Sequence, residues 1–113
     1  MRIDFYEFGR IIVEGQNYTH DLLILPDRII SPWWRLEGHE VGLKDLEIVW
    51  KEKISYLVIG TGAYGMMRVA EEAKKKTIEL SLNLIVQKTD KATQIYNQLE
   101  PTGKVAGAFH LTC

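Results

Sequence analysis

The sequence predicts a single α/β domain in which antiparallel N-terminal strands precede a C-terminal β-α-β-α-β unit. Short apolar runs separated by turn-forming residues occupy the first third of the chain. After residue 55, apolar runs alternate with stretches of helical periodicity. The 113 residues are expected to form one domain, 1–113, of a size that buries roughly two thirds of its unfolded surface.

Three apolar runs in the first third predict strands. They are RIIVEG (10–15), HDLLIL (20–25) and RIIS (28–31). Turn formers separate them, so an antiparallel meander is expected, and it must extend or cover the sheet formed by the rest of the chain. Between Gly42 and Lys53 the apolar residues recur at helical spacing, which predicts an amphipathic helix.

The C-terminal half predicts three parallel strands with two intervening helices. The run from Tyr56 to Ile59 lacks alternation, as in a strand covered on both faces, and a helix with a charged, solvated face follows the glycines after it. LNLIV (82–86) predicts a second buried strand, and Thr89 stands where the N-cap of the next helix is expected. A third strand is predicted over 105–112. Right-handed crossovers would make these strands parallel neighbours.

A glycine-rich motif lies between the first of these strands and the following helix. Gly60, Gly62 and Gly65, with Thr61 between the first two, match the spacing of a dinucleotide fingerprint. The next strand ends in Gln87-Lys88 rather than in the acid that would bind a ribose, and the remaining chain is short for two nucleotide-binding halves. A tight strand-to-helix turn is the favoured interpretation. Capture of a phosphate or carboxylate by the helix N-terminus, and a dinucleotide site, remain as alternatives.

His39, His110 and Cys113 are the candidates for metal or thiol chemistry. They could supply three soft ligands to zinc, yet structural zinc sites use four at motif spacing, so no metal or cofactor is predicted. A strand places residues three apart on opposite faces, which argues against a Cys-His pair and favours a hydrogen-bonded strand histidine at 110. A redox-active thiol at Cys113 is a further alternative.

Two adjacent tryptophans mark a possible binding surface. Trp33 and Trp34 follow Pro32 in SPWWRLEGHE, and in an extended backbone they cannot both face inward, so one should be exposed. They would form the wall of a pocket or a partner surface, with Arg35 and His39 as polar contacts. The alternative is one core tryptophan and one packed beneath a loop.

Charge and cysteine content narrow the classes of partner. The net charge of −1 offers no field for nucleic acid or an anionic membrane, so neither is expected as a partner. The single cysteine, Cys113, precludes an intrachain disulfide, and a reducing cytoplasm is the expected compartment. No window has the apolarity of a signal sequence or a membrane span.

Five segments, in order, resemble one family across almost the whole chain. They are YEFGRIIVEGQNYTHDLLILP, WWRLEGHEV, LVIGTGAYG, TDKATQIYNQL and the terminal VAGAFHLTC. They are similar to the domain-of-unknown-function family that includes an adipogenesis-associated protein and a mitochondrial complex I (NADH dehydrogenase) assembly factor.

This resemblance implies a three-layer α/β domain with a central mixed sheet, no established catalytic activity and no known cofactor. The family's eukaryotic members act through protein partners. The family pattern falls on residues to which it assigns no demonstrated role: Trp34, His39, Gly60, Gly62, Thr89, Asn97, His110 and Cys113.

The sequence leaves two hypotheses about function, which belong to different classes. The first is a non-enzymatic binding or assembly module, acting through protein partners and homo-oligomeric, that uses the Trp33-Trp34 segment and the glycine turn. The second is a binding protein or enzyme for a phosphate- or carboxylate-bearing ligand at the helix start after Gly62, with Thr89 or His110 as polar contacts. No catalytic constellation is recognised, so enzymatic activity stays open.

Overall fold

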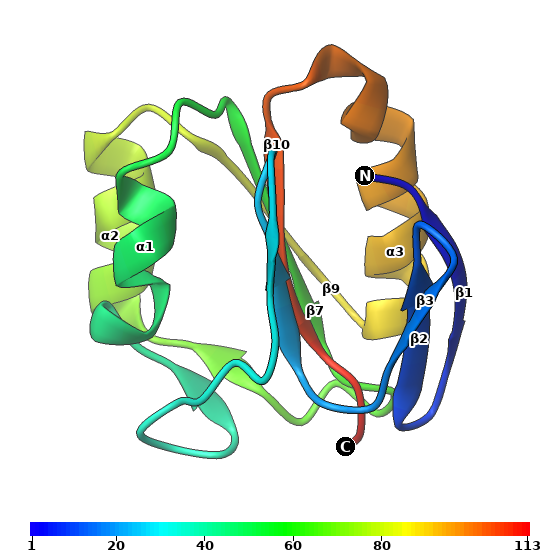
Figure 1. Ribbon diagram of the computed structural model, residues 1–113. Coiled ribbons are helices and arrows are strands. Elements are labelled where there is room, and N and C mark those ends of the chain that lie inside the picture. The colour runs from blue at the N-terminus through cyan, green and yellow to red at the C-terminus, as the bar shows by residue number, and fades with distance from the viewer.

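The computed structural model describes residues 1–113 as a three-layer arrangement around a mixed sheet. Figure 1 shows this sheet close to edge-on, with α1 (Glu47–Trp50) and α2 (Glu71–Glu79) on one side. On the other side lie α3 (Thr89–Leu99) and a small antiparallel sheet. The predicted fold class, an α/β domain with a central mixed sheet, is confirmed.

The central sheet has five strands in the order β5-β4-β10-β7-β9. Their bounds are β4 (Leu22–Ile24), β5 (Ile29–Ile30), β7 (Tyr56–Thr61), β9 (Asn83–Gln87) and β10 (Val105–His110). β7 pairs in parallel with both β9 and β10, whereas β4 is antiparallel to β10 and to β5. The predicted β-α-β-α-β unit and its parallel neighbours are therefore confirmed.

The N-terminal strands divide between two sheets instead of forming one meander. β1 (Ile3–Glu7), β2 (Arg10–Val13) and β3 (Gln16–Tyr18) form an antiparallel sheet that covers α3, while β4 and β5 extend the central sheet. The N-terminal strands were predicted to extend or to cover the main sheet. β4 and β5 extend it, and β1 to β3 lie in the layer that covers it. β1 and β3 have too few buried side chains to have been visible as apolar runs.

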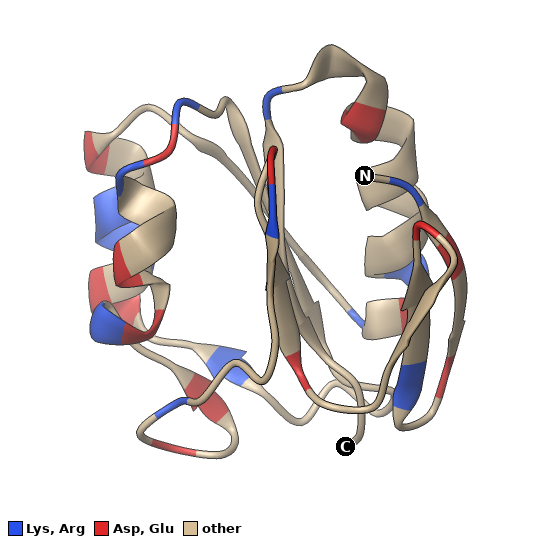
Figure 2. Ribbon diagram, viewed as in Figure 1, with Lys and Arg blue, Asp and Glu red and all other residues tan.

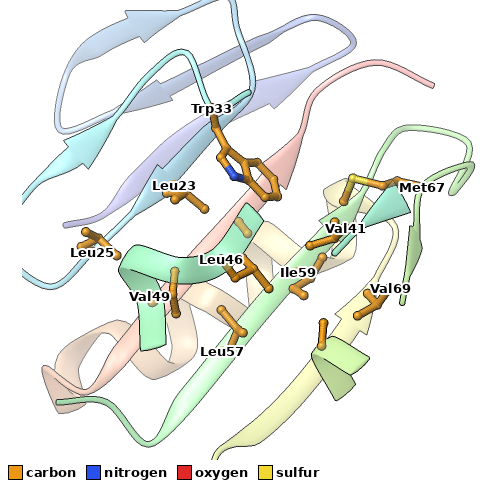
Figure 3. Packing of buried hydrophobic residues seen from close by; sticks show 13 residues of the cluster. Leu23, Leu25, Trp33, Val41, Leu46, Val49, Leu57, Ile59, Met67 and Val69 are labelled. Carbon is orange, nitrogen blue, oxygen red and sulfur yellow. The ribbon is translucent and has the colours of Figure 1, made fainter. Parts of the chain in front are cut away.

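Two apolar cores lie on the two faces of the central sheet. One packs α1, α2 and Trp33 against Leu57, Ile59 and their neighbours (Figure 3). The other packs α3 and the small sheet against Val58 and Phe109 from the opposite face. Residues of β7 and β10 alternate between these cores, which is why β10 is buried throughout and β7 is buried from Leu57 onward.

The helices differ from their predicted bounds. The helix predicted between residues 42 and 53 is a 3₁₀ turn, Lys44–Leu46, continued by the single α-helical turn α1. The helix predicted to follow the glycine motif begins only at Glu71, because residues 62–67 turn back and Arg68–Val69 form β8, which pairs with β6 (Glu40–Val41). A 3₁₀ turn, Glu100–Thr102, follows α3 and leads to Gly103.

Two further predictions are corrected. The prediction that 82–86 is a buried strand is wrong, because β9 is the outer strand of the sheet and only its middle is half-buried. Thr89 is the first residue of α3, not its N-cap, and the N-cap position belongs to Lys88. None of the helices is long and apolar enough to cross a membrane.

Candidate functional site

A cluster of buried ionic side chains lies at the carboxyl end of β10. Asp21 precedes β4, Arg35 lies in the segment between β5 and β6, and His110 ends β10. The Asp21 Oδ2 atom is 2.7 Å from His110 Nδ1 and 2.9 Å from Arg35 Nη1. The side chains of Arg35 and His110 are each more than nine-tenths buried. The cluster therefore joins three segments that are distant in sequence.

Hydrogen bonding fixes the tautomer of His110. Ionised Asp21 can only accept, so the proton lies on His110 Nδ1, which donates to the carboxylate. Burial by itself would raise the pKa of Asp21, but hydrogen bonds from His110 and the Leu111 amide, together with the adjacent Arg35 guanidinium, outweigh it and hold that pKa below its ordinary value. The carboxylate therefore stays ionised in the folded protein near neutral pH.

Arg35 is held by several contacts without being fully satisfied. Its Nη2 donates to the Gly38 carbonyl oxygen at 2.9 Å, and its guanidinium carbon lies 4.7 Å from the centroid of the Trp33 ring. The Nη1 contact with Asp21 is an ion pair without hydrogen-bond alignment, and Nε has no partner. Arg35 therefore fixes the segment 31–39 against the sheet through charge and stacking.

The Asp21-His110 pair has the form of a general-base dyad but is closed to substrate. His110 Nε2, the atom that would act as base, is buried and has no hydrogen-bond partner. The rings of His110 and His39 meet edge to face, with their centroids 6.0 Å apart. A pocket of about 340 Å³ beside the cluster is lined by Asp21, Trp33, Trp34 and Arg35 among others, and not by His110 or Gly62.

The glycine turn packs against the C-terminus of the chain. Gly62 has φ +104°, and a Cβ atom there would lie 2.5 Å from the Cys113 carbonyl carbon. Its amide donates to Thr89 Oγ1 at 2.8 Å, and Thr89 Oγ1 donates in turn to the His110 carbonyl oxygen at 2.6 Å. The Ala63 amide donates to the Thr112 carbonyl oxygen, and the Met66 amide to that of Cys113. These amides are therefore bonded within the chain.

This packing corrects the prediction of a helix N-terminus at the glycine motif. Because α2 starts at Glu71, no helix N-terminus follows Gly62 or Gly65 to receive an anion there. Gly60 permits close approach of α3 to β7, since a Cβ atom there would lie 2.8 Å from Thr89 Oγ1. Thr61 Oγ1 donates to the Gln87 carbonyl oxygen at 3.2 Å. The turn interpretation accounts for each of these residues.

The structure brings the predicted site residues to one end of the molecule. Figure 1 shows the chain's C-terminus, the turn after β7 and the segment before β6 together at the lower end. Trp33 is buried and donates through Nε1 to the Asp45 carbonyl oxygen, whereas Trp34 is 78% exposed. The prediction that one of the two tryptophans faces solvent is confirmed.

Exposed apolar side chains surround this end in three loops. Their members, which we call the apolar rim, are Phe8, Trp34, Leu36, Tyr64 and Met66. The rings of Phe8 and Tyr64 lie 5.9 Å apart between centroids, and Met66 shares a pocket with residues 37–40 of the tryptophan segment. The rim therefore spans the β1–β2 turn and the glycine turn, which meet at Phe8 and Tyr64, and the loop that carries Trp34, part of which lies beside Met66.

Two residues of this end were missed from the sequence. Asp21 gives only a weak signal, a charged residue directly before a wholly apolar strand, and its partner His110 is 89 residues away. Tyr6 donates to the Leu111 carbonyl oxygen at 2.9 Å, and burial, with the nearby charges of Asp90 and Asp21, raises its pKa to about 12. Both residues fix the C-terminal segment whose carbonyl groups bind the glycine turn.

Comparisons with known proteins find solved structures of the same fold. Its solved relatives include the conserved hypothetical protein PH1505 of Pyrococcus horikoshii OT3, with 27% identity, a TM-score of 0.84 and 100% of each chain covered. A Bartonella henselae structure described as an outer membrane protein has 23% identity and a TM-score of 0.83, covering 98% of this chain and 94% of that one. A Rhodopseudomonas palustris protein has 25% identity and a TM-score of 0.75, covering 95% and 80%.

The family predicted from the five ordered segments is confirmed by a match over nearly the whole chain. The matching family is described as a protein of unknown function, DUF498/DUF598, and the match spans residues 3–110. All five segments fall within or at the end of this range, including most of the C-terminal VAGAFHLTC. The chain therefore belongs to the DUF498/DUF598 family of proteins of unknown function.

Proposed function

We propose that this domain is a non-enzymatic binding or assembly module that docks a protein partner on the apolar rim. The observation that carries the proposal is the exposure of Trp34 and Leu36, which are 78% and 84% accessible, and Trp34 also lines a pocket of about 340 Å³. Contiguous exposed apolar groups, and tryptophan above all, are enriched where proteins bind partners.

The rim lies on a rigid support, which favours binding. The buried cluster of Asp21, Arg35 and His110 fixes the backbone on either side of Trp34, and the C-terminal carbonyl groups fix the turn that carries Tyr64 and Met66. A surface that is already ordered loses little conformational entropy when a partner binds. Asp21, Arg35 and His110 bond to one another and to the backbone of this chain. These contacts support a structural role for the cluster beneath the rim.

We also propose that the protein is cytoplasmic and that it associates with further copies of itself. The single cysteine is compatible with a reducing compartment. The exposed apolar side chains of this small domain also favour association with further copies.

The test is co-purification with the rim altered. Tagged wild-type protein and a variant carrying Trp34→Ala with Leu36→Ala should be expressed in the source cells and their bound proteins identified by mass spectrometry. We expect a partner that binds the wild type and falls at least tenfold in the variant, because the central anchors of an interface carry most of its energy. The affinity for that partner should then be measured with purified proteins by calorimetry.

A matched control separates a specific rim from general stickiness. Ile78, on α2, is as exposed as Trp34 at 76%, and it lies outside the rim. The Ile78→Ala variant should retain the partner at wild-type level, and thermal unfolding should show that all three proteins are folded. The same set of bound proteins on the wild type and on both variants would contradict the proposal.

A further inference from the structure

β9 presents a free strand edge to solvent. It pairs with β7 alone, and the Asn83 amide donates across that pair to the Ser55 carbonyl oxygen at 2.9 Å. Backbone groups alternate sides along a strand, so Ile85 and Gln87 also face β7. The amide and carbonyl groups of Leu84 and Val86 therefore point away from the sheet. Four hydrogen-bonding groups on this edge have no strand beside them.

The edge lacks the features that usually prevent pairing. β9 is Asn-Leu-Ile-Val-Gln, without a charge, a proline or a glycine, and Figure 2 shows no charged residue along this strand. The opposite edge of the sheet contrasts with it, because β5 has only two residues and is flanked by Asp27, Arg28 and Pro32. Short, charged or proline-flanked edges resist association, whereas a neutral five-residue edge favours it.

The β9 sequence is complementary to its own reverse. In an antiparallel pair centred on Ile85, residue i lies opposite residue 170 − i, so Leu84 faces Val86 of the second copy and Ile85 faces its own counterpart. Asn83 then faces Gln87. Every apolar side chain meets an apolar one and every amide meets an amide. Val86, which is 38% exposed in the single chain, would be covered.

The backbone agrees with the same register. Leu84 and Val86 are the residues whose amide and carbonyl groups point outward. In this register Leu84 of each copy lies opposite Val86 of the other, so the two-fold axis generates two such pairs. Such pairs exchange two hydrogen bonds each in an antiparallel ladder, whereas Ile85 falls at a non-hydrogen-bonded position where side chains approach most closely. A register shifted by one residue would place the outward-pointing backbone groups of one copy opposite residues of the other copy whose backbone groups point toward β7. The hydrogen bonds between the copies would then be lost.

We propose that two copies of this chain associate through β9, antiparallel and centred on Ile85, to join their five-stranded sheets into one continuous sheet. The occupant of the edge is a second copy because backbone polarity and side-chain type match at every position of the symmetric pair. A two-fold arrangement also closes on itself and leaves no further edge at β9. The proposal is independent of partner binding at the apolar rim.

Charge exchange at positions 83 and 87 tests the register. One variant carries Asn83→Glu with Gln87→Glu, and the other carries Asn83→Lys with Gln87→Lys. Both residues are exposed, so the fold should tolerate either change. In sedimentation or light scattering, wild type should have twice the 13.0 kDa chain mass. Each variant alone should have the single-chain mass, because like charges then face each other twice.

Mixing the two variants should restore the dimer as a one-to-one heterodimer, since opposite charges now meet. The control carries Gln16→Glu with Asn17→Glu, the same exchanges on β3, which is the outer strand of the small sheet. It should remain a dimer. A monomeric wild type, variants that stay dimeric alone, or a mixture that stays monomeric would each overturn the proposal. Loss of a different bound protein from the β9 variants, with a monomeric wild type, would assign the edge to that protein instead.

Discussion

Gly62 shows how one residue can be required for packing where its motif suggests ligand binding. Two properties exclude a side chain there: a backbone φ of +104°, and the Cys113 carbonyl carbon 2.5 Å from any Cβ atom. Both properties serve the contact between the turn and the C-terminus. The glycine spacing that resembles a cofactor fingerprint therefore arises here from close approach of backbone to backbone.

Gly62→Ala should destabilise the fold by about 3 kcal/mol, because left-handed backbone strain and displacement of the C-terminal segment add together. Gly103 is the control, since it also has positive φ, at +71°, but no atom lies within 4 Å of its Cβ position. Gly103→Ala should cost about 1 kcal/mol from backbone strain alone. Urea unfolding measures both values. Equal losses in the two variants would show that the clash at Gly62 is absent.

The first turn of α3 is attached to two strands by one hydroxyl group. Thr89 Oγ1 accepts from the Gly62 amide and donates to the His110 carbonyl oxygen, and the Thr89 side chain is fully buried. The helix is thereby fixed at the carboxyl ends of β7 and β10. A threonine at a helix start usually caps that helix, but here its hydroxyl joins the helix to the sheet.

Thr89→Val keeps the shape of the side chain and removes both bonds. It should cost about 3 kcal/mol, because the Gly62 amide and the His110 carbonyl group stay buried without their partner. Thr93→Val is the comparison, since Thr93 Oγ1 donates only to the Asp90 carbonyl oxygen within the same helix. Its cost should be below about 1 kcal/mol. Chemical denaturation of both variants decides the point, and a Thr89→Val loss no larger than that of Thr93→Val would contradict it.

The elements predicted correctly are those whose signal is local. β7 and β10 are buried on both faces and consist mostly of apolar residues, and α3 has a strong amphipathic period. The late start of α2 was not visible, because residues 62–70 are fixed by contacts with the distant C-terminus and with residues 39–41. The Asp21-His110 pair was missed for the same reason. No local sequence pattern around Asp21 or His110 predicts that the two residues are in contact.

The cluster of Asp21, Arg35 and His110 joins the central sheet to the loop between β5 and β6, which makes it a determinant of global stability. Asp21 begins the extension of the sheet, Arg35 holds the loop that carries the buried Trp33, and His110 ends the central strand. Trp33 in turn belongs to the core on the α1 face (Figure 3). Unfolding of the whole chain must therefore release this cluster.

The contribution of Asp21 to the free energy of unfolding should decrease at acidic pH. Although burial opposes ionisation, hydrogen bonds from His110 and Leu111 lower the pKa of Asp21 below its ordinary 3.8. A carboxyl group whose pKa is lower in the folded than in the unfolded state binds protons more readily when unfolded. Its stabilising effect is therefore complete above the unfolded pKa and is lost as the pH falls through the folded pKa.

Asp21→Asn should thus be less stable than wild type by about 3 kcal/mol near neutral pH, since Arg35 loses its buried counter-charge. As the pH falls from about 5 to about 2, the free energies of unfolding of the two proteins should converge, because wild-type Asp21 becomes neutral as well. The remaining carboxyl groups are common to both proteins, so their titration cancels in the difference. Urea unfolding at several pH values in this range measures that difference. A gap that stays constant with pH would show that the ionised carboxylate of Asp21 does not stabilise the fold.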